Sequence, residues 1–438
     1  MKKILVVGIV LLFLGSSVPV LAQTKEHSRP LSHILYVGGT GSGNYSKIQD
    51  AIDNASNGDT VFVFHGTYYE NVVINTTINL IGENRNTTII DGKRISNVVV
   101  LNVDNIKISN FTMQNCSWHY YYYTPEIKLL SNNSTISNNI IFTKSDLNYG
   151  ITIKGNHNNI IGNYITDDYV GINLNEGSSY NFIVDNNIHN GIGAERSCRF
   201  NTIIHNNISG WISSTANVDD WVISNNHLNG GGINMQGCEN VTITRNEINN
   251  AGLAIQTSGD QHFIISSNIV HKGELQISGS YFTVINNTID NVSYGIEYDE
   301  VAFGNCSFNK VTGCSYGLII TYPGESNFIF KNEFRNNNVG VYTLIEYGAV
   351  KIKCNNFINN SRDITFGQLF PIHRQTPINP IFNKNYYDNW KGTGPMVLWG
   401  RSVIFAIPFL YFPILITIPG IYCDWHPAQK PYDIPGLT

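Results

Sequence analysis

The stretch Val241–Asp260, VTITRNEINNAGLAIQTSGD, is one copy of a pattern that recurs on both sides of it. The preceding copy reads DWVISNNHLNGGGINMQGCEN, and the following copy reads QHFIISSNIVHKGELQISGS. Each copy has an Asn two places before an apolar residue, and then usually a Gly and a second run of alternating apolar residues. Alternation with a period of two is typical of strands that bury one face. The stretch therefore predicts short, half-buried strands.

Aligned on that Asn, the copies follow one another about every 22 residues, which is the period of a solenoid. Leucine-rich repeats share this period, but they need a leucine scaffold and usually a helical return limb. The limbs here are rich in Gly, Ser, Thr, Asn and β-branched residues, which are poor helix formers. The pattern favours an all-β fold, a single-stranded right-handed parallel β-helix. The repeated asparagines are Asn138, Asn163, Asn186, Asn206, Asn226, Asn246, Asn268, Asn287, Asn309, Asn332 and Asn355.

The repeated Asn has a physical explanation in such a fold. Coils of a parallel β-helix stack about 4.8 Å apart, so equivalent residues lie directly above one another. An inward-facing Asn at a bend can donate to and accept from the Asn of the neighbouring coils, and it tolerates unusual backbone angles. We therefore expect an asparagine ladder beside columns of stacked Ile and Val.

The first residues have the pattern of a secretion signal. Lys2 and Lys3 precede the apolar run Ile4–Leu14, and small residues follow up to Ala22. This pattern predicts a cleaved signal peptide over residues 1–22. A membrane anchor is the weaker interpretation, because a spanning helix needs roughly 20 apolar residues. We expect the mature protein to be extracellular or attached to the cell surface.

Residues 34–95 are expected to hold an N-terminal cap and the first coils. In NYSKIQDAIDNASNGDT, Ser46 is expected to cap a short helix that carries Ile48, Ala51 and Ile52 on one face. This helix would plug the open N-terminal end of the solenoid. The strands of the first coils are expected near residues 60–64, 72–74, 78–80 and 88–90.

Residues 96–390 are expected to form the repeats, and residues 391–438 a C-terminal capping segment. Within that segment, residues 403–421, VIFAIPFLYFPILITIPGI, are uncharged and long enough for a spanning helix. Pro408, Pro413 and Pro419 interrupt the run, and each interior Pro costs a helix one hydrogen bond and adds a clash. We favour the capping segment, and membrane attachment through this stretch is the alternative.

Composition excludes some classes of partner. Charged residues make up 13% of the chain and its formal net charge is −5, without a run of Lys and Arg. The chain therefore has no electrostatic footprint for nucleic acid. Its seven cysteines fit neither a disulfide framework nor a zinc knuckle, so we expect buried thiols with one bridge at most. Asn-x-Ser/Thr triplets, such as the one at Asn110, permit surface glycosylation.

Several segments resemble a known group of proteins. GTYYENVVI (66–74), LIGENRNTTIIDG (80–92) and the repeated NNxI…GIxI resemble the secreted right-handed parallel β-helix proteins of the pectin-lyase-like superfamily. Within it, the NosD-type periplasmic repeat proteins and archaeal cell-surface proteins are most similar, and NYYDNW and DWHPAQKPYDIPG resemble the closing segment of the archaeal ones. The resemblance covers about residues 34–438. It implies the fold and leaves activity open, because the group contains hydrolases, lyases, epimerases and proteins with no known reaction.

The strand after the repeat Gly is expected to expose two columns of side chains. One column is Thr152, Asn173, Gly193, Ser213, Asn234, Ala254, Gln276 and Glu297, and the other is Lys154, Asn175, Glu195, Thr215, Gln236, Gln256, Ser278 and Asp299. Amides suit hydrogen bonding to sugar hydroxyls, and aromatic rings stack on pyranose rings. The predicted ligand-binding residues are Lys154, Asn175, Asn234, Gln236, Gln256, Gln276, Trp118 and Tyr121. An ordinary solvated sheet face with a Tyr-rich loop is the alternative.

Catalysis on this face would need carboxylates that converge from adjacent coils. The candidates are Glu195, Arg196, Asp219, Glu297 and Asp299. Glu195 and Arg196 have Asp167 one coil earlier and Asp219 one coil later, which makes the nearest mixed acidic and basic group. The paired Asp, His-Gly and Arg-x-Lys signatures of the superfamily's hydrolases do not line up. A lyase would add a calcium-binding acidic cluster, so Ca²⁺ is the cofactor of that alternative.

The NosD resemblance also implies copper handling, which needs clusters of His, Met or Cys. The chain has four Met, and several of its histidines are scattered at positions 157, 189, 205, 227, 262 and 271. No metal ligand set is therefore predicted. The sequence predicts a secreted or cell-surface β-helix that binds a polysaccharide or forms part of the cell envelope. A polysaccharide lyase, hydrolase or epimerase is the first alternative, and copper handling is the second.

Overall fold

The structure is a computed structural model that describes residues 32–118, 123–142, 148–166, 169–215, 217–345, 350–369, 381–407 and 414–434. From His33 onward the chain forms one compact unit. This unit is a parallel β-solenoid of about 14 turns, as the repeat predicts. The predicted signal peptide over residues 1–22 lies outside the described residues. The division of the solenoid into cap, repeats and closing segment stays a prediction.

Each regular coil contributes three short strands, and these stack on their counterparts in the next coil to form three rows. Row 1 contains β4 (Val72–Ile74), β7 (Val99–Leu101), β10 (Pro125–Leu129), β13 (Tyr149–Ile153), β16 (Val170–Leu174), β19 (Ile192–Ala194), β22 (Ile212–Ser214), β25 (Ile233–Gln236), β28 (Leu253–Ser266), β30 (Leu275–Ile285), β32 (Tyr294–Ala302), β35 (Tyr316–Thr321), β38 (Val339–Ile345), β41 (Arg362–Leu369) and β44 (Met396–Ile407).

Row 2 shares β28 and β30 with row 1, because both strands continue around the corner. Its other members are β1 (Ile34–Val37), β2 (Thr60–Val63), β5 (Asn79–Gly82), β8 (Lys107–Ser109), β11 (Thr135–Ser137), β14 (Asn159–Ile161), β17 (Phe182–Val184), β20 (Thr202–Ile204), β23 (Val222–Ser224), β26 (Thr242–Thr244), β33 (Asn305–Ser307), β36 (Asn327–Phe330), β39 (Val350–Lys353) and β42 (Ile381–Asn383).

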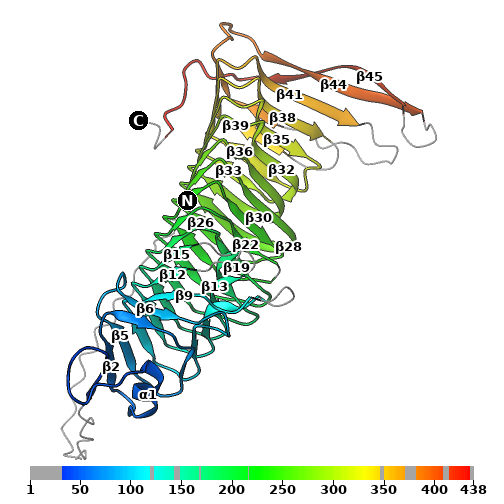
Figure 1. Ribbon diagram of the computed structural model, residues 1–438. Helices are drawn as coiled ribbons and strands as arrows, with labels where there is room; N and C mark the ends of the chain where they lie inside the picture. The colour runs from blue at the N-terminus through cyan, green and yellow to red at the C-terminus, as the bar shows by residue number, and fades with distance from the viewer. Residues whose placement is uncertain are drawn as a thin grey trace, which may run out of the picture. The chain divides into compact units, whose positions relative to one another are not determined.

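Row 3 is a separate sheet. It contains β3 (Gly66–Tyr68), β6 (Thr88–Asp91), β9 (Thr112–Gln114), β12 (Ile140–Phe142), β15 (Tyr164–Thr166), β18 (Asn187–Ile188), β21 (Asn207–Ile208), β24 (His227–Asn229), β27 (Glu247–Asn249), β29 (Ile269–His271), β31 (Thr288–Asp290), β34 (Lys310–Thr312), β37 (Glu333–Arg335), β40 (Asn356–Ile358) and β43 (Tyr386–Tyr387). Figure 1 shows the rows stacked from β2 and β5 at the blue end to β41 and β44 at the orange end.

The core is built from columns of one residue type. In row 1 the parallel register stacks Ile172 on Ile192, Ile212, Ile233 and Leu253, and each of these is at most 1% exposed. Because equivalent side chains lie above one another, each coil packs its core residues on those of the next coil. The alternation read from the sequence therefore corresponds to this buried column and its outward neighbours.

An asparagine ladder runs along the corner between rows 2 and 3. Asn226 shows the arrangement: its Oδ1 accepts from the backbone N and the Nδ2 of Asn206 at 2.9 and 3.0 Å. Its Nδ2 donates to the Ile203 carbonyl at 2.9 Å and to Asn246 Oδ1 at 3.0 Å. The ladder consists of Asn139, Asn163, Asn186, Asn206, Asn226, Asn246, Asn268, Asn287, Asn309, Asn332, Asn355 and Asn385.

The first position of the ladder differs from the prediction. Asn139 occupies it and is fully buried, whereas Asn138 lies at the surface, where its Nδ2 donates to Asn110. Asn138 has a φ of 54°, and the residue before most ladder asparagines is likewise left-handed. The bend is therefore made by the preceding residue, and the ladder Asn contributes hydrogen bonds instead of the unusual backbone angle.

A second, shorter polar ladder lies at the corner between rows 1 and 2. The backbone N–H groups of Ser134, Asn158 and Asn181 donate to the side-chain oxygens of Asn158, Asn181 and Asn201 at 2.9–3.0 Å. Trp221 ends it, because its indole N–H donates to the Cys198 carbonyl at 2.9 Å. The sequence analysis missed this ladder, since only three asparagines mark it.

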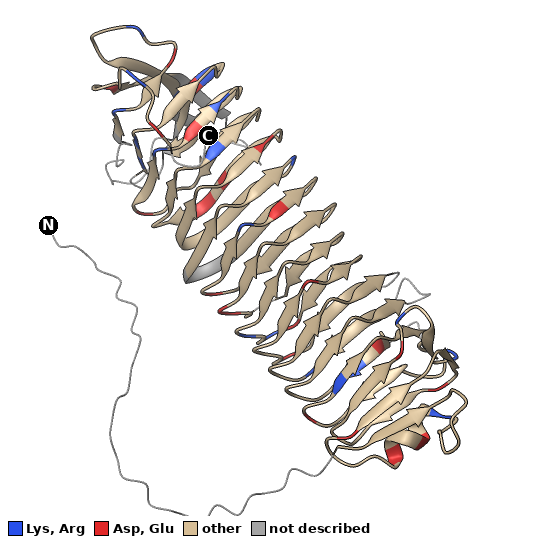
Figure 2. Cartoon of the chain, turned by 90° about the vertical axis from the view of Figure 1, so that its left-hand side faces the viewer, with Lys and Arg blue, Asp and Glu red and all other residues tan. Residues whose placement is uncertain are grey.

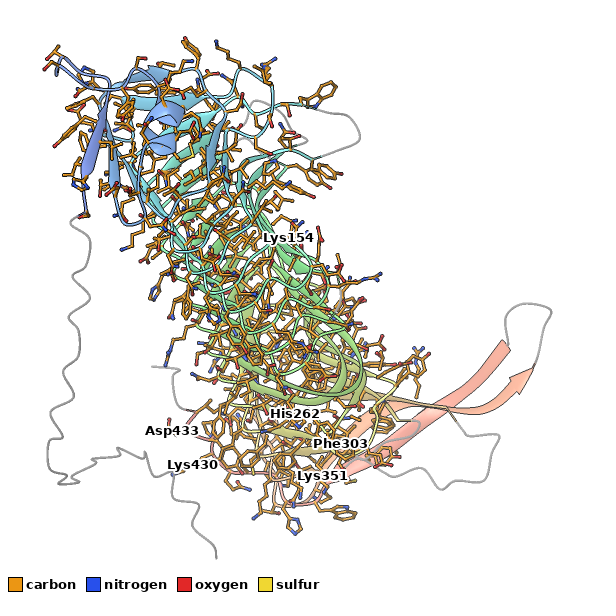
Figure 3. All side chains as sticks on the ribbon, turned by 90° about the horizontal axis from the view of Figure 1, so that it is seen from below. Lys154, His262, Phe303, Lys351, Lys430 and Asp433 are labelled. Atoms are coloured by element: carbon orange, nitrogen blue, oxygen red, sulfur yellow. The ribbon has the colours of Figure 1, made fainter. Side chains whose placement is uncertain are left out.

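Exposed aromatic rings stack in columns at the same corner. The ring centroids of His157, Tyr180 and Phe200 are 4.8 and 4.7 Å apart along one column. A second column has His262 over Tyr281 at 5.1 Å and Tyr281 over Phe303 at 4.9 Å. Figure 3 labels His262 and Phe303 at this part of the surface. The spacing matches the coil repeat, so these rings continue the stacking of the core outside it.

The short helix α1 (Ile48–Asp53) buries Ile48, Ala51 and Ile52 as expected. Its first turn is not capped by Ser46. Lys47 is the N-cap residue and makes no side-chain cap hydrogen bond, while the Glu70 carboxylate accepts from the backbone N of Ile48 and Gln49 at 2.8 and 3.0 Å. A carboxylate from the next coil thus satisfies the free N–H groups. The role of α1 as a plug stays a prediction.

The apolar stretch 403–421 is not helical where the structure describes it. Residues up to Ile407 belong to β44, and β45 (Ile414–Asp424) returns antiparallel to it, pairing Met396 with Asp424 and Ile407 with Ile414. The spanning-helix interpretation of this stretch is therefore wrong for those residues. No helix among the described parts of the chain has the length and apolarity to cross a membrane. All seven cysteines are free thiols.

Candidate functional site

The outward face of row 1 carries the two predicted columns. The strand register stacks Thr152, Asn173, Gly193, Ser213, Asn234, Ala254, Gln276 and Glu297 in one column. It stacks Gln236, Gln256, Ser278 and Asp299 in the other, and backbone hydrogen bonds align Lys154, Asn175, Glu195 and Thr215 with them at the strand ends. Figure 2 shows that charged residues are sparse over most of the solenoid. The polarity of this face comes from amides and hydroxyls.

The predicted ligand-binding residues differ in how accessible they are. Lys154, Gln236 and Gln256 are exposed, and Asn175, Asn234 and Gln276 are partly buried. The Oδ1 of Asn234 is buried without a hydrogen-bond partner. Trp118 is 52% exposed, and Tyr121 lies outside the described residues. Some side chains of this face are therefore exposed to solvent, and others are partly covered by their neighbours.

The predicted group around Glu195 is only partly assembled. Glu195 Oε1 accepts from Asn173 Nδ2 at 3.3 Å, and its Oε2 accepts from the Glu176 backbone N at 3.2 Å. Asp219 lies at the corner beyond β22 instead, where it pairs with Arg199 at 3.0 Å. Arg196 is exposed in the turn after β19. Asp167 lies outside the described residues. Glu195 thus accepts a hydrogen bond that stabilises the turn after β16.

Tyr149 lies near Glu195 and forms a cluster with Tyr123, which belongs to the Tyr-rich loop noted in the sequence, and with Tyr169. The Tyr123 ring is 4.9 Å from that of Tyr149 and 5.3 Å from that of Tyr169, and both pairs are stacked. Burial, followed by the nearby Tyr123 and Glu195, raises the pKa of Tyr149 to about 12. The sequence contained a signal for this cluster, because the three tyrosines follow one another at intervals of about one coil. Tyr123 and Tyr169 are each half exposed, so this cluster offers a stacking surface.

Glu297 and Asp299 form the clearest acidic pair on the face. They are alternate residues of β32, so both side chains point outward, and two residues advance about 6.6 Å along a strand. Burial, followed by the charges of Glu274 and Asp299, raises the pKa of Glu297, which Gln276 opposes by hydrogen bonding. Asp299 Oδ1 accepts from Thr321 Oγ1 at 2.8 Å. One carboxyl group thus favours the proton while the other is held as an acceptor.

A cavity of about 610 Å³ lies at the C-terminal end of the same face. The start of β44 forms one wall, and β35, β38 and β41 form the other. Its lining includes the rings of Tyr316, Tyr342 and Trp399 and the guanidinium groups of Arg362 and Arg401. The Tyr316 and Tyr342 rings meet edge-on at 5.9 Å. Sequence reasoning missed these residues because the wall comes from the stretch whose conformation was ambiguous.

The cavity is lined by one carboxyl group, that of Asp363, which is 5% exposed. Asn389 Nδ2 donates to its Oδ2 at 2.9 Å, and Asn360 Nδ2 to its Oδ1 at 3.3 Å. Burial outweighs these hydrogen bonds and raises the pKa of Asp363 to about 6. Asp363 is therefore partly protonated in mildly acidic solution.

The acidic pair and the cavity share one sheet face. Glu297 pairs with Ile319, Ile319 pairs with Tyr342, and Tyr342 pairs with Thr365 in the cavity wall. Two coils of about 4.8 Å separate Glu297 from Tyr342, or roughly 10 Å. A chain molecule lying along row 1 could therefore contact both.

The histidines do not form a metal centre. His227 Nδ1 lies 3.3 Å from Glu247, and His271 Nδ1 lies 2.8 Å from Asp290. Each is a single pair of a histidine and a carboxylate on row 3. Within the described ranges, no group of three or more His, Cys, Asp and Glu side chains is placed to hold a metal ion. The described residues thus do not supply the set of ligands that a copper or calcium centre needs.

The fold defines the chain as a parallel β-helix protein with a polar outward face. Residues 201–387 match the family model described as NosD, periplasmic copper-binding protein, so this part of the chain is similar to that family. A comparison with curated protein sequences gave no match. The resemblance inferred from the sequence is therefore confirmed.

The chain also has similarities to solved structures, all at low sequence identity. DFA-IIIase from Arthrobacter chlorophenolicus is 12% identical over 65% of this chain and 84% of its own, with a TM-score of 0.41. The catalytic domain of GH87 alpha-1,3-glucanase in complex with nigerose is 13% identical over 76% of this chain and 66% of its own, with a TM-score of 0.41. Pectin methylesterase PemA from Erwinia chrysanthemi is 11% identical over 50% of this chain and 78% of its own, with a TM-score of 0.28.

Proposed function

We propose that the protein binds a polysaccharide outside the cytoplasm, along the outward face of row 1. The observation that carries the proposal is the cavity of about 610 Å³, lined by Tyr316, Tyr342 and Trp399, at the end of a face of amides and hydroxyls. Sugar sites combine aromatic rings with a few polar groups, and ligand cavities usually measure about 300–1,000 Å³. The periplasmic description of the matched family and the predicted signal peptide support the location.

Binding is tested with the chain from residue 23 onward on a panel of immobilised polysaccharides. Trp399→Ala removes a half-exposed ring from the cavity wall, and Trp425→Ala removes a similarly exposed ring that does not line it. Stacking of about 1.4 kcal/mol corresponds to roughly 10-fold in affinity. We expect that loss for Trp399→Ala and wild-type affinity for Trp425→Ala. Equal effects of the two changes, or no retention on any polysaccharide, would contradict the proposal.

A second candidate function is cleavage of that polysaccharide by Glu297 and Asp299. The observation that favours it is the outward pair of carboxyl groups, in which burial raises the pKa of Glu297 and Asp299 accepts a hydrogen bond from Thr321, because two carboxyl groups flank the scissile bond in glycosidases. Both carboxyl groups lie on one face of β32, two residues apart, and glycosidases carry their two carboxyl groups within about 10 Å of each other. Glu297 would act as the acid and Asp299 as the base.

Cleavage is tested by incubating the polysaccharides that bind and reading the products by mass spectrometry. Shortened chains that disappear with Glu297→Gln and persist with Glu300→Gln, an exposed neighbour, would establish the enzyme. Retention of the polysaccharide without products from the wild-type protein would leave binding as the function.

A further inference from the structure

Two arginines line the cavity, and their guanidinium groups form no ion pair with any described residue. Arg362 begins β41 and Arg401 lies in β44, so they reach the cavity from its two walls. Arg199 and Arg335, by contrast, pair with Asp219 and Glu333 at 3.0 and 2.8 Å. The charges of Arg362 and Arg401 therefore stay available to a ligand.

The formal charge of the cavity lining is opposite in sign to that of the whole chain. The chain has a formal net charge of −5, yet the cavity lining holds two guanidinium groups and a single carboxyl group, Asp363. Asp363 is engaged by Asn360 and Asn389 and is partly neutral in mildly acidic solution. Burial and the neighbouring Tyr316 raise the pKa of Tyr342, and the positive charge of the nearby Arg401 partly opposes this shift. The cavity thus carries a local positive charge beside aromatic rings.

We propose that this cavity recognises an acidic oligosaccharide, with its sugar rings against Tyr342 and Trp399 and its carboxylate or sulfate groups at Arg362 and at Arg401. The proposal rests on polysaccharide binding by row 1 and names the class of sugar. A guanidinium donates two parallel hydrogen bonds to a carboxylate or sulfate, which gives both affinity and orientation. A neutral sugar would strip water from the arginines without replacing those hydrogen bonds, so the cavity should also discriminate against it.

The experiment compares three matched probes by calorimetry with the chain from residue 23 onward. They are a uronic-acid tetrasaccharide, the same tetrasaccharide with every carboxylate methyl-esterified, and a sulfated tetrasaccharide. We expect the acid to bind at least 10-fold more tightly than the ester. The sulfated probe identifies the anionic group: whichever anion binds more tightly is the one the cavity recognises.

Variants show whether the discrimination comes from the two arginines. Arg401→Gln and Arg362→Gln should each weaken binding of the preferred anion about 10-fold and leave the ester unchanged. Arg245→Gln alters an exposed arginine at the corner between rows 2 and 3 and should change neither. Far-ultraviolet circular dichroism checks that each variant is folded. The acid-to-ester ratio of the wild-type protein needs no variant, so it remains decisive if one misfolds.

The results separate this inference from the proposed function. If the ester binds as tightly as both anionic probes, or if the arginine changes affect the ester equally, the acidic-sugar inference is overturned while polysaccharide binding stands. If no probe and no polysaccharide binds, both are overturned. A preference for either anion that depends on Arg362 and Arg401 supports both.

Discussion

The ladder asparagines contribute more to stability than any outward-facing asparagine. Each is almost fully buried and makes several hydrogen bonds to neighbouring coils, as at Asn226. The amide lets one side chain satisfy donors and acceptors on both sides, which no other uncharged residue of that size except Gln can do. A buried polar group without a partner costs about 1–3 kcal/mol.

Asn226→Ala should therefore lower the free energy of unfolding by about 2–3 kcal/mol, because it leaves the backbone N–H and side-chain amide of Asn206 without their acceptor. The measurement is the urea midpoint followed by circular dichroism. The neighbouring Asn207→Ala is the control, since Asn207 is exposed on β21. Similar midpoints for the two variants would show that the ladder is not a stabilising element.

The ladder also shows how far residue-level prediction can reach. In the sequence Asn138-Asn139-Ile140-Ile141, each asparagine stands two places before an isoleucine, so spacing alone allows both. Packing decides, because Ile141 is fully buried whereas Ile140 is only partly covered. Where a single apolar residue followed, the pattern predicted the ladder position even beside a second Asn, as at Asn206-Asn207-Ile208. Where two isoleucines followed, the choice depended on contacts between coils.

Asp363 should make stability depend on pH. Its folded-state pKa of about 6 lies above the ordinary Asp pKa of 3.8, so between those values the folded chain holds a proton that the unfolded chain has lost. The free energy of unfolding should therefore fall as pH rises from about 4 to 6, by up to about 3 kcal/mol from this group. Asp363→Asn should remove that slope, whereas Asp433→Asn, at an exposed site, should keep it. Urea unfolding at several pH values measures both.

At the level of elements, the end of the ladder explains how the C-terminal hairpin is attached. Asp424, in β45, is fully buried, and its Oδ2 accepts from the backbone N and the Nδ2 of Asn385 at 2.9 and 3.0 Å. Its Oδ1 accepts from the backbone N of Lys384 and of His426, both at 3.1 Å. A carboxylate suits this position because it only accepts, so it ends a chain of donors.

Asp424→Ala should loosen β44 and β45 from the last coil while the earlier coils stay folded. Five donors lose their acceptor, since the Tyr387 hydroxyl also donates to Asp424 Oδ2 at 3.3 Å. The loss is confined to the terminal repeat of a structure whose repeats contact only their neighbours. Limited proteolysis should release fragments beginning near residue 396 at least 10 times faster than from the wild-type chain. Asp433→Ala, at an exposed site near the same end, should leave the rate unchanged.

The same hairpin marks the limit of prediction for the candidate site. The outward columns followed from a period of two, which is a local property of the strands. The cavity depends instead on the place where β44 meets β41, through the pairing of Gly367 with Arg401. Apolar residues 403–421 allowed a strand, a cap or a helix, and only contact with the last coil chose among them. Trp399 and Arg401 therefore had no signal as site residues.

At the scale of the whole molecule, the solenoid separates stability from function along its axis. Contacts in a repeat array are made mainly between adjacent coils, so a distant coil affects the cavity little. The stabilising features are equally local: each coil from Asn139 to Asn385 repeats the buried column and one ladder Asn. The candidate site uses only the coils from β32 to β44. The earlier coils supply the rigid support on which that face is held.

Deleting one whole coil should therefore preserve both fold and binding. Removal of residues 227–246 takes out one repeat of 20 residues and places Asn226 directly before Glu247, so Ile208 stacks on Ile248 and Ile212 on Leu253. We expect cooperative unfolding, circular dichroism of a β-solenoid and wild-type affinity for the tetrasaccharide that the cavity prefers.

The matched control deletes residues 227–236, half a repeat. That change removes β24 and β25 but leaves β26, so the inward residues and the ladder of the following coil no longer meet those of the preceding one. A one-residue error already exchanges the two faces of a strand, and half a repeat displaces all three rows. This variant should aggregate or unfold at much lower urea. If it tolerated urea as well as the whole-coil deletion, register between coils would not be what holds the solenoid together.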